Sequence, residues 1–110
     1  MPKERSPFGT FIDETLGYIH AKTEAALGPT VTIERTEDTL ILEFESGQQL
    51  FFNNLEIREA IGFASPLSGR RLFYYDRDKD SWLSMRDGAD LYELLREEFA
   101  TLSGTPIVFD

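Results

Sequence analysis

The sequence predicts an α+β sandwich, in which two helices near the ends of the chain pack on one face of an antiparallel sheet of about six strands. Near both ends, apolar residues recur every three or four positions, which is the period of an amphipathic helix. Between these segments, apolar and polar residues alternate in short runs separated by turn residues, as in half-buried strands. Because helical and strand patterns are segregated along the chain, this architecture is favoured over an alternating parallel fold.

The first helix is expected to begin at Ser6. This serine can act as the N-cap, and Pro7 suits the first helical position because its missing N–H needs no partner there. Gly28 and Pro29 are expected to end the helix as cap and stop. The predicted apolar stripe of this helix consists of Phe8, Phe11, Ile12, Leu16, Ile19, Thr23, Ala26 and Leu27.

The middle of the chain is expected to form six short strands. The clearest pair flanks a turn at Ser46 and Gly47, where glycine can adopt the positive φ that a tight hairpin needs. Leu40, Leu42 and Phe44 occupy alternate positions before this turn, so they share one face of their strand. The predicted strands cover residues 31–35, 39–45, 49–53, 58–64, 71–76 and 81–85.

A second helix is expected after the strands. Asp90 would cap its N-terminus, with Glu93 three residues later in a spacing like that of a capping box. Gly104 would end it, followed by a short extended tail over residues 105–110. Its predicted apolar stripe consists of Leu91, Leu94, Leu95, Phe99 and Leu102.

Length and composition limit the classes of function. The chain has 110 residues, so we expect one domain over residues 1–110, with residues 1–6 flexible. It has no cysteine, which excludes disulfides, thiolate metal sites and thiol catalysis. No apolar stretch is long enough to cross a membrane, and the first residues do not resemble a secretory signal, so no membrane partner and a cytoplasmic location are expected.

The chain is acidic, with 20 carboxylate residues against 11 basic ones and a formal net charge of −9. Such a charge repels phosphate backbones, so we expect no nucleic-acid partner. It favours cations or a basic partner protein instead. The alternative is that the acidity only keeps the domain in solution.

Several sequence features occur in a characteristic order. Asn53 closes the second strand of the central hairpin, and the following strand ends in small residues and Pro66. A tryptophan ends the Asp-Ser-Trp run at residues 80–82, and an Asp-Gly pair at residues 87–88 precedes the last helix. In this order the features resemble the frataxin family, whose bacterial members are called iron donor proteins. The resemblance extends from about Phe11 to the end of the chain and implies a two-layer frataxin-like sandwich.

The resemblance also implies a function without a catalytic pocket. Frataxins bind iron weakly through exposed carboxylates and contact the iron–sulfur cluster assembly machinery, notably a cysteine desulfurase and a scaffold protein. We therefore expect a frataxin-like protein that binds Fe²⁺ or Fe³⁺ weakly and modulates iron–sulfur cluster assembly. An enzyme is not expected, and the ferroxidase activity sometimes ascribed to the family is not assumed because the acids are few.

The resemblance places the iron-binding residues on the first helix, the adjoining edge strand and the turn that follows it. Iron accepts hard oxygen ligands and imidazole, and His20 and Glu24 are four residues apart, so they share one helix face. The alternative is that the carboxylates, with Lys22 among them, only form the solvated face of an amphipathic helix. The residues expected to bind the metal are His20, Glu24, Glu34, Glu37, Asp38, Asp13 and Glu14.

The second functional surface implied by the resemblance is the exposed face of the sheet, which usually carries an asparagine, glutamines, a proline and a tryptophan. Asn53 matches the asparagine, but Gly62 stands at the tryptophan position. Leu55 and Ala60 replace the glutamines, and Ile57 replaces the proline. Apolar side chains at shifted positions could supply the missing contact area. The residues expected to contact a partner are Ile41, Phe51, Asn53, Leu55, Phe63 and Trp82.

These departures leave alternatives open. The chain could keep the frataxin-like fold and serve as a metal-free protein-interaction module. Trp82 could be a core residue rather than a docking residue. Arg70 and Arg71 could meet a carboxylate or a phosphate, or they could simply be solvated.

Overall fold

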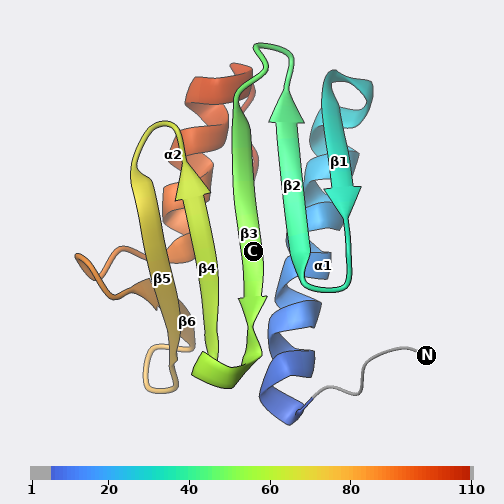
Figure 1. Cartoon of the computed structure of the whole chain (residues 1–110). Helices are drawn as coiled ribbons and strands as arrows, with labels where there is room; N and C mark the ends of the chain where they lie inside the picture. The colour runs from blue at the N-terminus through green and yellow to red at the C-terminus, as the bar shows by residue number, and fades with distance from the viewer. Residues whose placement is uncertain (1–5, 110) are drawn as a thin grey trace.

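The computed structural model describes residues 6–109. It contains helix α1 (Pro7–Leu27), six strands and helix α2 (Leu91–Ser103), with short 3₁₀ helices at Gly28–Thr30 and Glu56–Arg58 (Figure 1). Of the N-terminal segment expected to be flexible, residues 1–5 lie outside the described residues. The strands are β1 (Val31–Arg35), β2 (Thr39–Phe44), β3 (Gln49–Leu55), β4 (Ala60–Ser65), β5 (Gly69–Asp76) and β6 (Ser81–Ser84).

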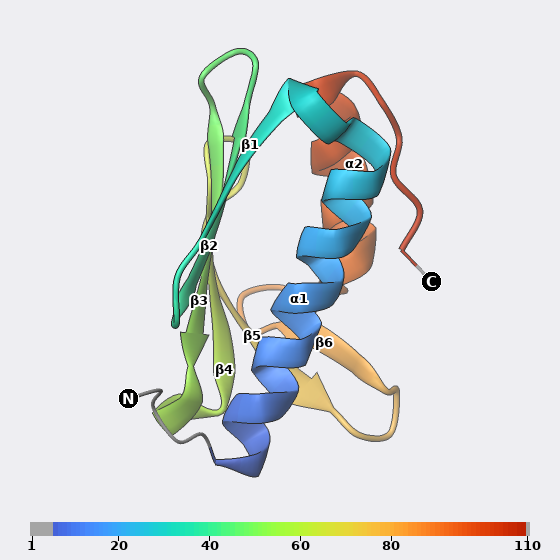
Figure 2. The ribbon, with the colours of Figure 1, turned by 90° about the vertical axis from the view of Figure 1, so that its right-hand side faces the viewer.

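The six strands form one antiparallel sheet in the order β1-β2-β3-β4-β5-β6, so every strand pairs with its neighbours in sequence. Both helices cover the same face of this sheet (Figure 2). The predicted α+β sandwich is therefore confirmed. The face turned away from the helices is called the outer face below. Within residues 6–109, no helix is long and apolar enough to cross a membrane.

Helix α1 begins and ends as its sequence predicts. The Ser6 hydroxyl accepts a hydrogen bond from the Gly9 N–H at 3.0 Å, which satisfies one of the N–H groups left over in the first turn. Gly28 caps the other end with a φ of 50°. The predicted apolar stripe is wrong at Ala26, whose side chain is exposed. In the last turn of the helix, only Leu27 is buried in the core.

The core lies between the helices and the inner face of the sheet, and all six strands and both helices contribute to it. One aromatic group joins the start of α1 to β5 and β6. The Trp82 ring stacks on Phe11 with ring centroids 5.3 Å apart, and it meets Phe8 and Tyr75 in edge-on contacts. Trp82 is only 3% exposed, so it is a core residue.

The connection between β3 and β4 differs from the prediction. The strand expected over residues 58–64 begins only at Ala60, because Glu56–Arg58 forms a 3₁₀ turn. Glu59 adopts a left-handed conformation with a φ of 55°, which completes the reversal between the two strands. As a result, Ile57 lies on the outside of the turn and is 98% exposed.

Helix α2 carries a buried carboxylate on its core-facing side. Asp90 caps the helix by accepting hydrogen bonds from the N–H groups of Tyr92 and Glu93. Two turns later, Glu98 is buried and accepts hydrogen bonds from the hydroxyls of Ser65 and Ser68. These hydrogen bonds, in addition to apolar packing, hold α2 against the turn between β4 and β5.

The C-terminal tail folds back against both helices. Ile107 and Phe109 are buried, and the Phe109 ring stacks on Tyr92 with ring centroids 5.5 Å apart. The Phe99 and Tyr18 rings contact Phe109 edge-on. Burial raises the pKa of Tyr92 to about 12, since the charged phenolate would lose its hydration there.

A buried arginine organises the turn between β6 and α2. The Arg71 guanidinium donates a hydrogen bond to the Ser84 hydroxyl at 3.1 Å and another to the Asp87 carboxylate at 2.7 Å. Arg71 is almost fully buried while Asp87 is about half exposed. The carboxylate therefore compensates a charge that has lost most of its contact with water.

Replacing Asp87 by asparagine is expected to remove part of the acid sensitivity of the fold. The hydrogen bond from Arg71, together with one from the Ala89 N–H, lowers the pKa of Asp87 below its ordinary value of 3.8. A lowered pKa stabilises the folded state above the ordinary value, and this stabilisation is lost as the pH falls through the folded-state pKa. Urea midpoints of the wild type and D87N should thus differ between pH 7 and 5, and this difference should shrink as the pH falls below the ordinary value of 3.8. The exposed turn variant D78N is the control, and equal acid slopes for wild type and D87N would contradict the assignment.

Candidate functional site

Three of the four predicted metal-binding residues on α1 lie in a stripe along one side of the helix. Asp13, Gly17, His20 and Glu24 are separated by four, three and four residues, so they share one face. This face lies against β1, because the Arg35 guanidinium reaches it at two points. Arg35 contacts Asp13, and its Nη1 lies 3.6 Å from where a Cβ on Gly17 would be.

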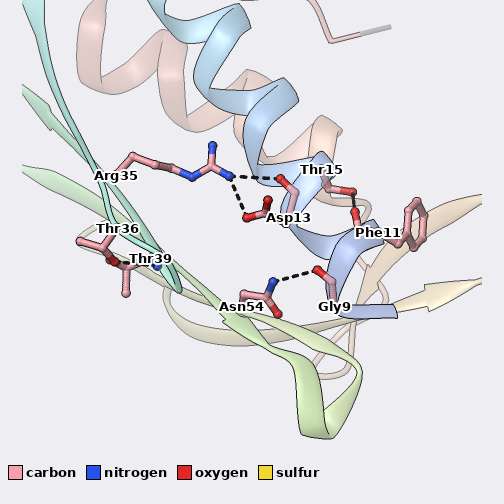
Figure 3. Close-up of polar contacts among 8 residues, drawn as sticks. All are labelled: Gly9, Phe11, Asp13, Thr15, Arg35, Thr36, Thr39 and Asn54. Atoms are coloured by element: carbon pink, nitrogen blue, oxygen red, sulfur yellow. Dashed lines mark hydrogen bonds and ion pairs between the residues drawn. The ribbon is translucent and has the colours of Figure 1, made fainter. Parts of the chain in front are cut away.

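Arg35 neutralises the first acid of this stripe. Its Nη2 donates a hydrogen bond to the Asp13 carboxylate at 3.0 Å and another to the Asp13 carbonyl oxygen at 3.2 Å. The two side chains point toward each other between α1 and β1 (Figure 3). Nearby, the buried side chain of Asn54 donates a hydrogen bond to the Gly9 carbonyl at 3.0 Å and anchors the start of α1 to β3. Asp13 is therefore engaged in holding the helix to the sheet.

Lys22, the other basic residue near the predicted ligands, lies away from the stripe on α1. Lys22 falls on the opposite side of α1 from the stripe, half a helical turn from His20 and Glu24. Its ammonium group lies 5.9 Å from the centre of the Tyr18 ring, a cation–π geometry. The side of α1 that carries His20 and Glu24 keeps its acidic character, with Glu24 exposed and His20 half-buried.

The four remaining predicted ligands lie outside the stripe on α1. Glu34 pairs with Ile41 across the strands and points to the outer face of the sheet, because its neighbour Arg35 points to the helix side. Glu37 and Asp38 lie in the turn between β1 and β2. Glu14 is one residue away from the stripe on α1 and therefore faces about 100° away from it.

The seven predicted ligands are thus distributed along one edge of the molecule without converging. Among residues 6–109, no three side chains of His, Cys, Asp or Glu type lie close enough to hold a metal ion together. His20 and Glu24 are the two predicted ligands that lie one helical turn apart on the same face. Such an edge can attract cations through its field and hold one by two side chains and water, but it is not a closed coordination site.

The outer face of the sheet carries four of the six predicted partner-contacting residues. Ile41 pairs with Phe51, and Asn53 pairs with Gly62, while the alternate positions of these strands point into the core. Leu55 lies two residues beyond Asn53 on the same face. Ile41, Phe51, Asn53 and Leu55 are all partly exposed and are available for contact.

The other two predicted contact residues lie on the inner face, which is a correction. Phe63 pairs with Phe52, and both are buried in the core. Trp82 pairs with Tyr75 and packs against α1. Because side chains alternate across a sheet, the strand register decides these orientations, and the register was not known from the sequence.

Gly62 is covered by a neighbouring side chain. A Cβ at this position would lie 3.1 Å from Leu55 Cδ1 and 3.3 Å from Asn53 Cβ. Leu55 therefore lies over the glycine and fills part of the space in which a tryptophan would stand. A large residue at position 62 would have to displace Leu55, so the two positions are sterically coupled.

The outer face also contains residues that the sequence did not single out as a group. A depression of about 510 Å³ lies over β3, β4 and β5. The exposed side chains of Arg70, Met85 and Arg86 border it. Arg70 was noted in the sequence as able to meet an anion, but Arg86 was not singled out. Met85 continues the pairing of β5 with β6, because its N–H donates a hydrogen bond to the Leu72 carbonyl.

Comparison with known proteins places the chain in a family. A sequence model of the frataxin-like domain matches residues 1–105. The iron–sulfur cluster assembly protein CyaY of Cupriavidus taiwanensis is 28% identical over 111 residues, which cover 98% of this chain and 97% of that protein. The structure of frataxin from Psychromonas ingrahamii has a TM-score of 0.82 at 22% identity, with 94% of both chains covered. Trimeric frataxin from Saccharomyces cerevisiae, solved in complex with ferrous iron, has a TM-score of 0.68 at 24% identity and covers 94% of this chain and 91% of its own. The chain belongs to the frataxin family.

Proposed function

We propose that this protein binds iron weakly at the edge formed by α1 and β1 and modulates iron–sulfur cluster assembly in the cytoplasm. The observation that carries the proposal is the match of the frataxin-like domain over nearly the whole chain. Two further facts support it. A relative similar over 98% of this chain is an iron–sulfur cluster assembly protein, and a structure with the same fold was solved with ferrous iron.

His20 and Glu24 are the proposed contacts for the metal. They share one face of α1, and within residues 6–109 neither forms an ion pair. An imidazole and a carboxylate one helical turn apart can contact one cation, with water filling its other positions. Binding by two side chains is weak and reversible, which suits a protein that transfers or senses iron rather than storing it.

The same acidic edge is the proposed contact for partners of the cluster assembly machinery. The chain carries a net charge of −9, and opposite charge on a partner accelerates association and fixes orientation. A cysteine desulfurase with a basic surface and the scaffold protein of cluster assembly are the proposed partners. Pull-down of both proteins from the source organism tests this part of the proposal.

An anaerobic Fe²⁺ titration followed by ¹⁵N NMR tests the metal site. Signals of residues 20–24 should broaden first, because the paramagnetic ion relaxes nearby nuclei most strongly. E24Q and H20A should each weaken Fe²⁺ binding about fivefold or more, equivalent to about 1 kcal/mol. R35Q should strengthen it by about 1.4- to 5-fold, since loss of an exposed ion pair of about 0.2–1 kcal/mol leaves Asp13 uncompensated.

Matched substitutions on α2 provide the controls. E97Q removes one exposed carboxylate and R96Q one exposed guanidinium, so each repeats the charge change of E24Q or R35Q away from α1. Equal effects of E24Q and E97Q, or broadening spread evenly over the molecule, would contradict a site on α1.

A metal-free interaction module on the same fold is the second candidate. Two observations favour it: no three possible ligands converge within residues 6–109, and Leu55 fills the space over Gly62. Retention of the desulfurase by the metal-free protein and by E24Q alike, without any Fe²⁺-induced broadening, would support this candidate over iron binding.

A further inference from the structure

The β5–β6 hairpin brings a phenol, a carboxylate and an indole into contact. The Tyr75 hydroxyl donates a hydrogen bond to the Asp80 carboxylate. The centre of the Tyr75 ring lies 5.5 Å from that of Trp82 and 4.9 Å from that of Phe11. Asp80 is exposed and Tyr75 partly exposed, whereas Trp82 is buried. The phenol therefore connects the buried indole to the surface, with a base at its hydroxyl.

The backbone of the turn holds the carboxylate in this place. Asp80 has a φ of 50°, a left-handed conformation that aspartate and asparagine tolerate better than most residues other than glycine. The preceding turn is fixed by a hydrogen bond of 3.1 Å from the Lys79 N–H to the Asp76 carboxylate. Glycine is the usual residue at a positive φ, but it would leave the Tyr75 hydroxyl without this acceptor.

A phenol beside a base is suited to losing one electron. Tyrosine and tryptophan are readily oxidised by one electron, and an oxidised phenol becomes a strong acid that must release its proton. A carboxylate that already accepts the hydrogen bond can take this proton at once. The hydrogen bond to Asp80 raises the pKa of Tyr75 above its ordinary value, so the phenol keeps its proton until the electron leaves. Because the two rings are in contact, Tyr75 can also supply an electron to an oxidised Trp82.

We propose that Tyr75, Asp80 and Trp82 form a one-electron oxidation site that carries oxidising equivalents from the aromatic core to the surface. The substrate is a one-electron oxidant such as the carbonate radical, which ferrous iron and peroxide generate in the presence of bicarbonate. Tyr75 gives one electron to this oxidant or to an oxidised Trp82, and its O–H bond breaks as the proton passes to Asp80. The tyrosyl radical then takes an electron from ascorbate or a thiol and recovers the proton from Asp80.

Flash photolysis of the full chain tests this proposal without iron. The oxidant is tris(bipyridine)ruthenium(III), generated by a light flash, and transient absorption distinguishes indole radicals from tyrosyl radicals. In the wild type the indole radical should decay as the tyrosyl radical grows. In Y75F the indole radical should persist. D80N should slow tyrosyl formation about tenfold or more, because a carboxamide does not act as a base.

Two variants provide matched controls. Y74F removes the neighbouring phenol, which is also partly exposed and which donates no hydrogen bond to a carboxylate within residues 6–109. D78N removes another exposed carboxylate of the same turn. Both should behave as the wild type. Asparagine tolerates the left-handed conformation of residue 80, so D80N should keep the fold, and urea unfolding verifies this.

A nitroso spin trap followed by peptide mass spectrometry locates the radical, and the adduct should lie on Tyr75. Equal rates in D80N and D78N, an indole radical as long-lived in the wild type as in Y75F, or adducts mainly on other tyrosines would overturn the proposal. E24Q should leave the radical kinetics unchanged. Failure of the proposed iron site and failure of this oxidation site are therefore separate outcomes.

Discussion

Replacing Trp82 by alanine is expected to lower the free energy of unfolding by about 3–5 kcal/mol, the range typical of large aromatic residues truncated in a core. The ring is 3% exposed, stacks on Phe11 and contacts Phe8 and Tyr75 edge-on. Its loss would open a cavity between α1 and the β5–β6 hairpin, which the neighbouring rings can fill only in part. Urea unfolding followed by far-UV circular dichroism measures the change.

The Trp82 experiment also separates the two roles that the sequence left open. W82F keeps an aromatic ring and should retain more of the stability than W82A. If W82A unfolded at the wild-type urea concentration but captured less desulfurase or scaffold protein, Trp82 would be a docking residue and the core assignment would be wrong. Equal capture by the folded fractions of W82A and wild type is the expected result.

Replacing Phe99 by alanine is expected to have an effect of similar size, about 3–5 kcal/mol. Phe99 is fully buried on α2 and makes edge-on contacts with Phe44 of β2 and with Phe109 of the tail. The substitution therefore weakens two interfaces at once, the helix–sheet contact and the closure of the tail. Thermal and urea unfolding measure the total loss.

A second measurement shows how much of the lost stability of F99A comes from a loosened C-terminal tail. Burial beneath the tail contributes to the raised pKa of Tyr92, about 12, so a loosened tail should lower that pKa toward 10. Ultraviolet titration of the tyrosines should show this shift in F109A and, to a lesser degree, in F99A. F99L preserves most of the apolar volume and should cost less than about 1.5 kcal/mol. A loss in F99L equal to that in F99A would contradict the packing argument.

The helices and most strands were predictable because local signals and tertiary contacts agree. Ser6 and Asp90 cap their helices as expected, and Gly28 and Gly104 end them. The start of β4 was not predictable. Ile57 continues the apolar alternation of the chain in sequence, yet it lies exposed on a turn whose last residue has a left-handed conformation. A glycine would normally mark such a turn, and none is present there.

The candidate sites were predictable in composition but not in orientation. Acidic residues on α1 and around β1 were identified, but only the structure shows Asp13 paired with Arg35 and Glu34 on the outer face. Glu98 was also missed. It continues the apolar stripe three residues after Leu95, and this spacing was the one available sign that a carboxylate would be buried. Charged residues at core-facing positions are rare enough that the ordinary interpretation is solvent exposure.

The order of the strands in the sheet, which follows their order in the sequence, affects how the chain folds. Each strand pairs with the next one along the sequence, so the sheet can grow hairpin by hairpin, and each step closes only a short loop at small entropic cost. The contact between Tyr18 of α1 and Tyr92 of α2 is different, because it brings opposite ends of the chain together. Joining the two ends is therefore the step with the greatest loss of chain freedom, and the nascent protein can complete it only after nearly all of its residues have been synthesised.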